Sequence, residues 1–239
     1  MPDRLGFVFI AQFASGPWEA NCYLVGAETD LVAIDPGIDS YEIIESALKE
    51  RGWNLVGVFA THGHVDHIGQ AAELANAHGV PLWMHEADDF MLTEPAKGLS
   101  WDSRQLLEML DISPLPAPEK REYFVDGQKI SIAGLEFSIT EAPGHSPGCC
   151  LISVEDENPV IFVGDVVFAG SIGRTDLPRG DVNVMKKTLA TKILPLDDSS
   201  QLFPGHGPAT TMAKERAMNP YLQPEFLDGS NPAFLQFAD

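Results

Sequence analysis

The stretch FATHGHVDHIGQ, residues 59–70, places three histidines and an aspartate within six positions. His62 and His64 are two residues apart, so in an extended backbone both side chains point to the same side and can reach one metal ion. Asp66 and His67 follow where the chain turns into a helix, and they can face a second position nearby. Imidazole nitrogens and carboxylate oxygens are suitable ligands for zinc and ferrous iron. The stretch therefore predicts metal binding but supplies only part of each site.

Three more polar residues come directly after predicted apolar strands, each among glycines. They are His145 in APGHSPG, Asp165 in FVGDVVF and His206 in LFPGHGP. Strand ends on one rim of a sheet are where a layered fold places its site, so we expect these residues to meet the first cluster. The other two histidines, His78 and His85, fit a helix end and a strand end without metal.

The candidate ligands divide into two sets that share one residue. The first set is His62, His64 and His145, the second is Asp66, His67 and His206, and Asp165 would bridge the two ions. Three protein ligands and a bridging carboxylate leave room for a bridging water, the open position that catalytic zinc requires. We expect two divalent ions, zinc first and iron or manganese as alternatives. Asp165 and Asp66 are also the predicted catalytic carboxylates, with Asp66 orienting the attacking hydroxide.

Short strands alternate with helices along the chain, which predicts an α/β fold with helices outside two packed sheets. The predicted strands are 7–11, 21–25, 31–34, 55–59, 80–84, 129–132, 135–141, 149–154, 160–163 and 201–203, and the predicted helices are 41–50, 70–77, 182–193 and 212–218. We expect one domain over residues 1–239. Residues 87–118 predict short helices and a loop that form a lid or rim of the site, and residues 220–239 a C-terminal tail.

Composition restricts the partners. A net charge of −20 repels phosphate backbones, so we expect no nucleic-acid partner. No apolar run approaches a membrane span, and the N-terminus lacks the basic region of a signal peptide. The three cysteines show no disulfide spacing, which favours reduced thiols in a cytoplasmic protein. The oligomeric state stays open.

The sequence resembles the metallo-β-lactamase superfamily. The resemblance rests on motifs at Thr61–Gly69, Gly144–Gly148, Gly164–Asp165 and Pro204–Pro208. Within the superfamily, residues 164–181 (GDVVFAGSIGRTDLPRGD) and 204–222 are similar to the short glyoxalase II-like hydrolases. The resemblance implies an αββα four-layer sandwich, a two-metal centre and hydrolysis of a thioester such as S-lactoylglutathione. Longer glyoxalase II enzymes carry a C-terminal helical domain that supplies much of the glutathione site, whereas this sequence stops at residue 239, which leaves the thiol carrier open.

Hydrolysis also fits the chemistry of the predicted centre. Bound zinc lowers the pKa of water from about 15.7 to about 7, which gives hydroxide at neutral pH. The positive charge of two ions suits a tetrahedral oxyanion, and the sequence shows no serine or cysteine nucleophile motif. Arg174 lies where the longer family members hold the carrier with a basic residue. We predict that Arg174 and Arg179 bind an anionic substrate tail; the alternative is an internal salt bridge with Asp176 or Asp181.

Three other functions remain open on the same residues. A persulfide (sulfur) dioxygenase of this fold resembles the chain in its histidine motif and would bind one iron at His62, His145 and Asp165, although His206 completes a second site that it does not need. A lactonase would use the same oxyanion chemistry. A non-catalytic metal-binding regulator is disfavoured because a structural site is closed and would not need seven ligands around two ions.

Overall fold

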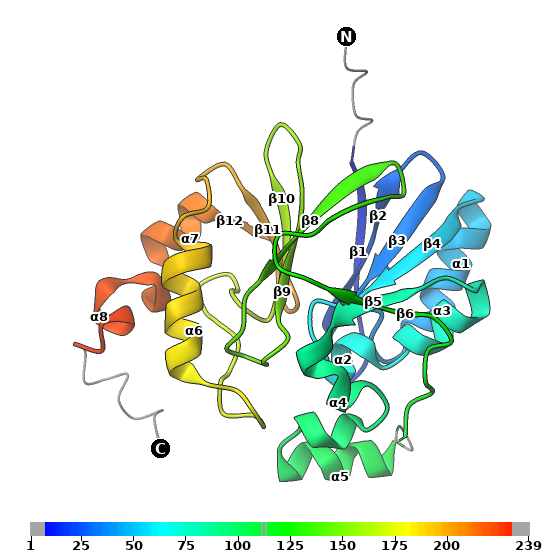
Figure 1. Ribbon diagram of the computed structural model, residues 1–239, viewed down its shortest axis with the longest axis horizontal. Coiled ribbons are helices and arrows are strands. Elements are labelled where there is room, and N and C mark those ends of the chain that lie inside the picture. The colour runs from blue at the N-terminus through cyan, green and yellow to red at the C-terminus, as the bar shows by residue number, and fades with distance from the viewer. Residues whose placement is uncertain (1–7, 111, 113, 231–239) are drawn as a thin grey trace.

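Two six-stranded sheets stack face to face in the computed structural model, which describes residues 8–110, 112 and 114–230 (Figure 1). The first sheet has the order β1 (Phe9–Ser15), β2 (Ala20–Ala27), β3 (Asp30–Ile34), β4 (Asn54–Phe59), β5 (Leu82–His85) and β6 (Arg121–Phe124). The second sheet has the order β12 (Thr210–Thr211), β11 (Gln201–Pro204), β10 (Val160–Gly164), β9 (Cys150–Val154), β8 (Leu135–Glu141) and β7 (Lys129–Ile132). Strands β3 to β6 run parallel, as do β10 and β11, and the other neighbours are antiparallel.

Helices cover the outer face of each sheet. The helices of the described residues are α1 (Tyr41–Arg51), α2 (Val65–Ile68), α3 (Ala71–His78), α4 (Asp89–Leu92), α5 (Trp101–Met109), α6 (Val182–Thr188), α7 (Met212–Met218) and α8 (Pro224–Leu227). Short 3₁₀ turns lie at Glu86–Asp88, Pro95–Gly98 and Pro220–Leu222, and a π-helical turn, Leu189–Ile193, extends α6. Figure 1 shows α1 and α3 outside the first sheet and α6, α7 and α8 outside the second. The predicted αββα layering is confirmed.

Alternation along the strands separates three apolar cores. In β2, Tyr23 and Val25 point into the core between the sheets, whereas Cys22 and Leu24 point toward α1 and α3. A strand buried on both faces is apolar throughout, because each successive side chain faces a covered surface. The third core lies between the second sheet and helices α6 to α8. This packing fixes the ends of the strands, from which the polar loops emerge.

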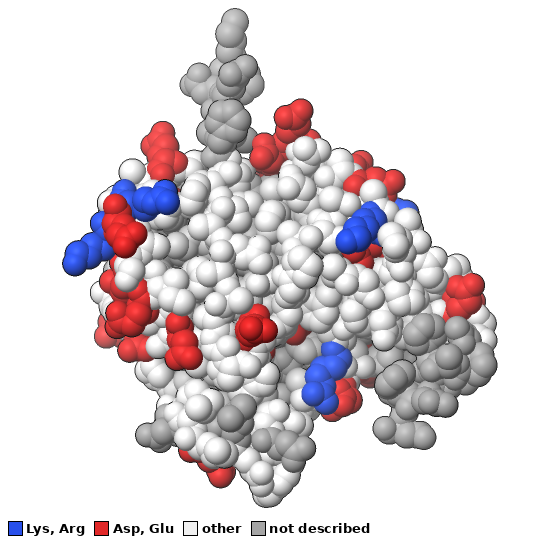
Figure 2. All heavy atoms as spheres, turned by 180° about the vertical axis from the view of Figure 1, so that it is seen from behind, with Lys and Arg blue, Asp and Glu red and all other residues white. Residues whose placement is uncertain are grey.

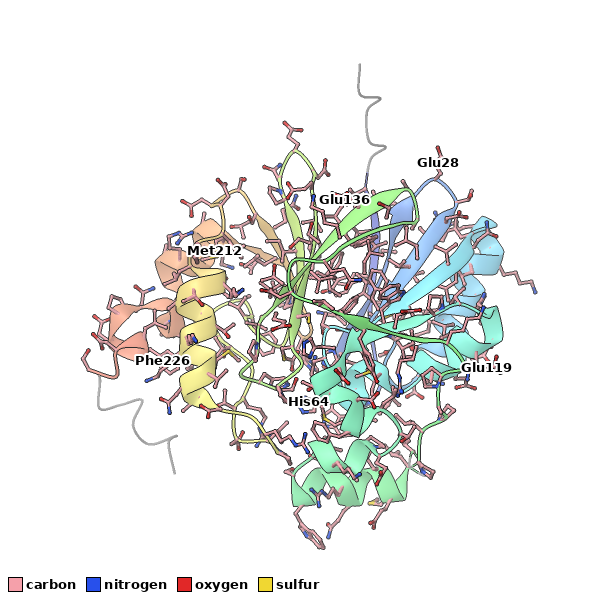
Figure 3. The ribbon with its side chains drawn as sticks, viewed as in Figure 1. Glu28, His64, Glu119, Glu136, Met212 and Phe226 are labelled. Atoms are coloured by element: carbon pink, nitrogen blue, oxygen red, sulfur yellow. The ribbon has the colours of Figure 1, made fainter. Side chains whose placement is uncertain are left out.

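One edge of the sandwich gathers the loops that carry the predicted ligands. The loops after β4, β8, β10 and β11 all emerge there, because β4 is parallel to its neighbours and β8, β10 and β11 run in the same direction. Hydrogen bonds that join the sheets at this edge include those from Asn21 N to Gly205 O (2.7 Å) and from Cys150 N to Thr61 O (2.8 Å). Figure 3 shows His64 at this edge, far from Glu28 and Glu136 at the opposite one.

Most of the predicted elements are present, with shifted ends. Strand β1 begins at Phe9 and continues to Ser15, beyond the predicted end at residue 11; residue 7 lies outside the described residues. The predicted helix 182–193 is α-helical only to Thr188. Strand β6 was not predicted, because its sequence REYF is polar and forms the edge of a sheet. In α1, Ile44 and Leu48 are buried, whereas Ile43 is 42% exposed.

The remaining sequence predictions have mixed outcomes. The three cysteines are free and buried. Within the described residues, no helix is long and apolar enough to cross a membrane. Acidic side chains are more widespread than basic ones on the face that Figure 2 shows. The predictions of a single domain and of a cytoplasmic location stay predictions. The described residues of the segment 87–118 form short helices and turns as expected, and residues 231–239 of the predicted tail lie outside the described part.

Candidate metal centre

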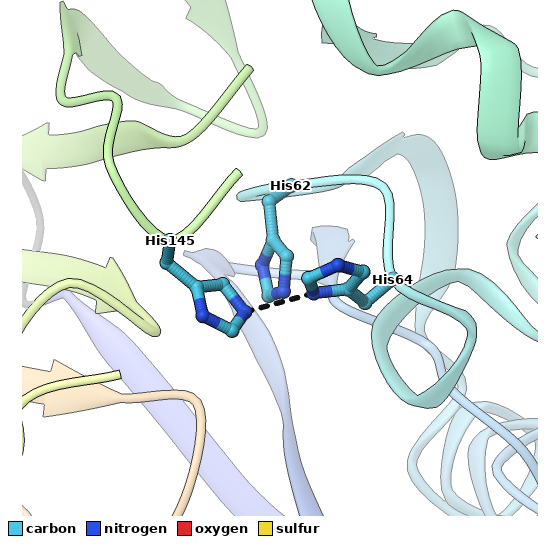
Figure 4. Close-up of side chains that lie close together, drawn as sticks. All are labelled: His62, His64 and His145. Atoms are coloured by element: carbon cyan, nitrogen blue, oxygen red, sulfur yellow. Dashed lines mark hydrogen bonds between the residues drawn. The ribbon is translucent and has the colours of Figure 1, made fainter. Parts of the chain in front are cut away.

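The first predicted set of ligands comes together in the structure. His62 and His64 lie on the loop between β4 and α2, and His145 lies on the turn between β8 and β9. All three are buried, and their candidate ligand atoms lie within 4.8 Å of one another. His64 Nδ1 is 2.8 Å from His145 Nε2, and the ring of His62 lies beside both (Figure 4). Two chain segments 81 residues apart thus supply one cluster of three imidazoles.

The second predicted set is also assembled. Asp66 and His67 lie in the short helix α2, and His206 follows β11. Their candidate ligand atoms lie within 4.8 Å of one another. Asp66 Oδ2 is 3.3 Å from His206 Nε2 and 3.7 Å from His67 Nε2. His67 is fully buried, and the other two are partly exposed toward the cavity described below.

Asp165 lies between the two sets. Its Oδ2 atom is 3.5 Å from His145 Nε2 in the first set, and its Oδ1 atom is 3.4 Å from His67 Nε2 in the second. Oδ2 is also 3.7 Å from His206 Nε2. Asp165 thus has one ligand set on each side, which is the position that a carboxylate shared by two ions would need.

Unpaired polar atoms indicate what the centre binds. The buried atoms that have no hydrogen-bond partner within the described part of the chain include Nε2 of His62, His64 and His67 and Oδ1 of Asp165. A buried polar atom without a partner is unfavourable by about 1–3 kcal/mol, so such atoms are rare unless a water or an ion satisfies them. Here they converge with further imidazoles and carboxylates, which is the donor chemistry of a divalent cation site. The residues present therefore fit two divalent ions.

The charge states of the histidines differ between the sets. Burial lowers the pKa of His64 to about 3 and that of His145 to about 4, and it also lowers the pKa of His62. These imidazoles are neutral at pH 7, so each has a nitrogen lone pair that can bind a metal ion. For His67, burial acts in the same direction, but the carboxylates of Asp66, Asp165 and Asp35 outweigh it and raise the pKa to about 10. The second set thus favours positive charge, which a divalent ion also supplies.

Asp35 is a functional residue that sequence reasoning missed. It follows β3 in DPG, residues 35–37, and was not among the predicted site residues. It is 1% exposed; its Oδ2 accepts from His67 Nδ1 (3.0 Å) and Thr61 Oγ1 (2.7 Å), and its Oδ1 from Thr61 N (2.7 Å). Because a carboxylate only accepts, Nδ1 keeps its proton when His67 becomes neutral, and Nε2 is then free toward Asp66 and Asp165. Its position directly after an apolar strand, like that of Asp165, was the available signal.

A cavity of about 340 Å³ opens over the two sets. Its lining includes ligand residues of both sets together with Trp18, Leu99, Ser103, Phe168, Gly173, Arg174 and Leu177. The centre is therefore reachable by a small organic molecule, and the cavity walls are largely apolar away from the ligands. Leu99 and Ser103 belong to the segment predicted as a lid or rim.

The two predicted substrate-binding arginines have different surroundings. Arg174 lines the cavity, but its guanidinium forms two 2.7 Å hydrogen bonds to Asp176, which is the internal salt bridge considered as the alternative. Its backbone carbonyl accepts a hydrogen bond from His145 Nδ1 (2.7 Å), which fixes the orientation of that imidazole. Arg179 is not among the cavity-lining residues described; its guanidinium stacks on Phe90 of α4, 3.9 Å from the ring centre. Substrate binding by either residue stays a prediction.

The two histidines assigned to no metal lie where expected. His78 ends α3 and contacts Glu45 at 2.5 Å, and His85 ends β5 and contacts Glu141 at 3.1 Å.

The metallo-beta-lactamase superfamily profile matches residues 15–206, which include all seven candidate ligands. The chain belongs to the metallo-beta-lactamase superfamily. This membership confirms the resemblance and the fold, and it makes the protein a metal-dependent hydrolase of that superfamily. The individual ligand assignments stay predictions that the geometry fits.

Three proteins of different kinds are similar to this chain. The chain is 35% identical over 206 residues to the hydroxyacylglutathione hydrolase GloC of Haemophilus influenzae, and the match covers 86% of this chain and 93% of that protein. The crystal structure of the BLEG-1 B3 metallo-beta-lactamase matches with a TM-score of 0.79 and 32% identity, over 90% of this chain and 100% of that one. The crystal structure of TTHA1623 in a di-iron-bound form matches with a TM-score of 0.71 and 30% identity, over 88% and 99%.

Proposed function

We propose that the protein hydrolyses the thioester of a small thiol carrier, of the S-lactoylglutathione type, at a centre of two divalent ions. In this reaction water adds to the thioester carbonyl, the C–S bond breaks, and a carboxylic acid and a free thiol leave. His62, His64 and His145 would hold one ion, Asp66, His67 and His206 the other, and Asp165 would contact both. When bound, such ions lower the pKa of water and polarise a carbonyl oxygen.

The observation that carries the proposal is the position of Asp165 between two complete sets of ligands. Its two oxygens lie 3.4 and 3.5 Å from imidazole nitrogens of different sets. A single-ion enzyme needs only three of these residues, whereas a two-ion hydrolase uses all seven. Both sets border the same cavity, so one substrate carbonyl can reach the space between them.

The protein's own groups orient and enclose the reactants. Asp66 is partly exposed to the cavity, so its carboxylate can accept a hydrogen bond from the attacking water and direct it toward the carbonyl. Trp18, Phe168 and Leu177 offer apolar surface for the organic part of the substrate and exclude bulk water. A thiolate, whose conjugate acid has a pKa of about 8.5, leaves without strong help from a general acid. These features support a thioester as the substrate.

The similar proteins support the choice of carrier and define the alternatives. The Haemophilus influenzae relative is a hydroxyacylglutathione hydrolase, which favours a glutathione-like thiol, and the BLEG-1 structure is a B3 metallo-beta-lactamase. The test is therefore a panel of S-lactoylglutathione, other acyl thioesters, a lactone and a β-lactam, assayed with protein loaded with zinc, iron or manganese. We expect thioesters to give the highest kcat/KM.

Matched histidine variants control the assay. His145→Ala removes a ligand of the first set, and we expect hydrolysis to fall at least about 100-fold. His78→Ala removes a histidine at the end of α3, outside both sets, and should retain full activity. A preference for the lactone or β-lactam would refute the thioester proposal. Oxygen uptake on a glutathione persulfide with one iron per chain would identify the dioxygenase instead.

A further inference from the structure

A buried carboxylate outside the two ligand sets connects the loops of the first set. Asp88 ends the 3₁₀ turn Glu86–Asp88 between β5 and α4, and its side chain is fully buried. A fully buried acidic side chain is rare, because burial disfavours its charge unless hydrogen bonds compensate. The groups that hydrogen-bond to Asp88 therefore indicate what it does.

Three donors reach the Asp88 carboxylate, and they come from the two loops that carry the first set. Gly63 N donates to Oδ2 at 2.8 Å, and Gly63 lies between His62 and His64. Ser146 Oγ donates to Oδ2 at 2.6 Å and Gly148 N to Oδ1 at 2.7 Å, and both follow His145 in the sequence. One carboxylate thus bonds to both sides of the three-imidazole cluster.

The glycines of these loops are required by this contact. A Cβ atom on Gly63 would lie 2.8 Å from Asp88 Cβ, and a Cβ atom on Gly148 would lie 2.6 Å from Asp88 Cγ. Both distances are shorter than real Cβ contacts, so any larger residue would push the backbone N–H groups away from the carboxylate. The glycines that flank the histidines in THGH and HSPG therefore act together with Asp88.

We propose that Asp88 is a positioning residue that sets the separation of the His62–His64 loop and the His145 loop, and thereby the affinity of the first metal site. Outer groups that orient ligands in this way contribute about 10- to 100-fold to metal affinity. The second set is held by other contacts, including Asp35 on His67, so Asp88 acts on one site only. The inference rests on the two-ion centre of the proposed function, but not on its substrate.

Asp88→Asn tests this with little change in shape. An amide has one accepting oxygen, so it can retain the bonds from Gly63 and Ser146 but presents an NH₂ group to the Gly148 N–H. Metal-free protein is titrated with Zn²⁺ against a competing chelator, without any substrate. We expect one of the two binding steps to weaken about 10- to 100-fold and the other to keep its affinity. Failure of the thioester assay would leave this result unaffected.

Three controls separate positioning from a general loss of structure. Asp89→Asn makes the same change in the next residue, whose carboxylate pairs with Arg121 on the surface, and both affinities should stay unchanged. Ser146→Ala removes one of the three hydrogen bonds and should weaken the same binding step to a smaller extent. In a His145→Ala background, Asp88→Asn should cause no further loss of affinity, because coupled residues are not additive.

Two results would overturn the inference. One is equal weakening of both binding steps in Asp88→Asn, which would indicate a role in overall stability. The other is unchanged affinity in both Asp88→Asn and Ser146→Ala, with both variants folded by circular dichroism.

Discussion

Replacing Asp35 with asparagine should weaken the second metal site while leaving the fold intact. Asp35 is a residue with positive φ (54°), a conformation that asparagine tolerates as readily as aspartate. The change therefore removes charge and one accepting oxygen without straining the backbone. In the orientation that keeps the bond from Thr61 N, the new amide NH₂ faces His67 Nδ1, which must then accept. The His67 proton moves to Nε2, the atom that points toward Asp66 and Asp165.

The size of the effect follows from the bonds that are lost. A buried hydrogen bond to a charged group contributes about 1.5–3 kcal/mol, so we expect the second site to bind Zn²⁺ about 10- to 150-fold more weakly. This range agrees with the losses found when outer partners of metal-bound histidines are removed. Thioester hydrolysis at limiting metal should fall by a similar factor and recover partly at high Zn²⁺.

The assay is a chelator-competition titration of the metal-free variant beside Asp30→Asn. Asp30 is the first residue of the same strand and is exposed, and its carboxylate accepts a hydrogen bond from the Asn54 side chain. The Asp30→Asn variant therefore controls for a charge change in β3. If Asp35→Asn binds two ions as tightly as the wild type, the assignment of the His67 proton to Nδ1 is wrong, and so is the positioning role of Asp35.

Three further predictions follow from the centre and its cavity. The pKa of His67 is raised to about 10, so this residue must lose a proton to bind metal, and the metal affinity of the second set should rise about tenfold per pH unit between about pH 6 and 9. The metal affinity of the first set should stay constant over this range, because the pKa values of His64 and His145 are about 3 and 4. Equal slopes in metal titrations of the two sets would contradict this. Arg174→Ala should raise KM for S-lactoylglutathione about two- to fivefold with kcat unchanged, since Arg174 is 55% exposed and shared with Asp176; an unchanged KM would reject docking at this residue. Dialysis against a chelator should abolish hydrolysis and added Zn²⁺ should restore it, so activity that survives metal removal would refute metal dependence.

The sequence was informative wherever a local pattern implied a position in space. His62 and His64 could be grouped by their spacing, and His145 and His206 by their position after apolar strands. These arguments need only the alternation of side chains and the convergence of strand ends, which are properties of any layered α/β fold. The two packed sheets with helices outside were predicted from the alternation of short strands with helices along the chain.

Contacts between distant residues could not be predicted in the same way. Asp88 bonds to groups 25, 58 and 60 residues away, and nothing in its neighbouring sequence indicates them. Strand β6 lies at a sheet edge and is largely exposed, so its sequence REYF lacks the alternation of apolar and polar residues by which a strand is predicted. The pairing of Arg174 with Asp176 was one of two options, since sequence spacing does not decide between a surface salt bridge and a free guanidinium.

The most direct test of the two-ion centre is anomalous X-ray diffraction from crystals of the metal-loaded protein, recorded at the absorption edges of zinc, iron and manganese. We predict two anomalous peaks per chain, one among His62, His64 and His145 and one among Asp66, His67 and His206, with Asp165 in contact with both. A single peak at His62, His145 and Asp165, with the second set free of metal at saturating concentrations, would contradict the account.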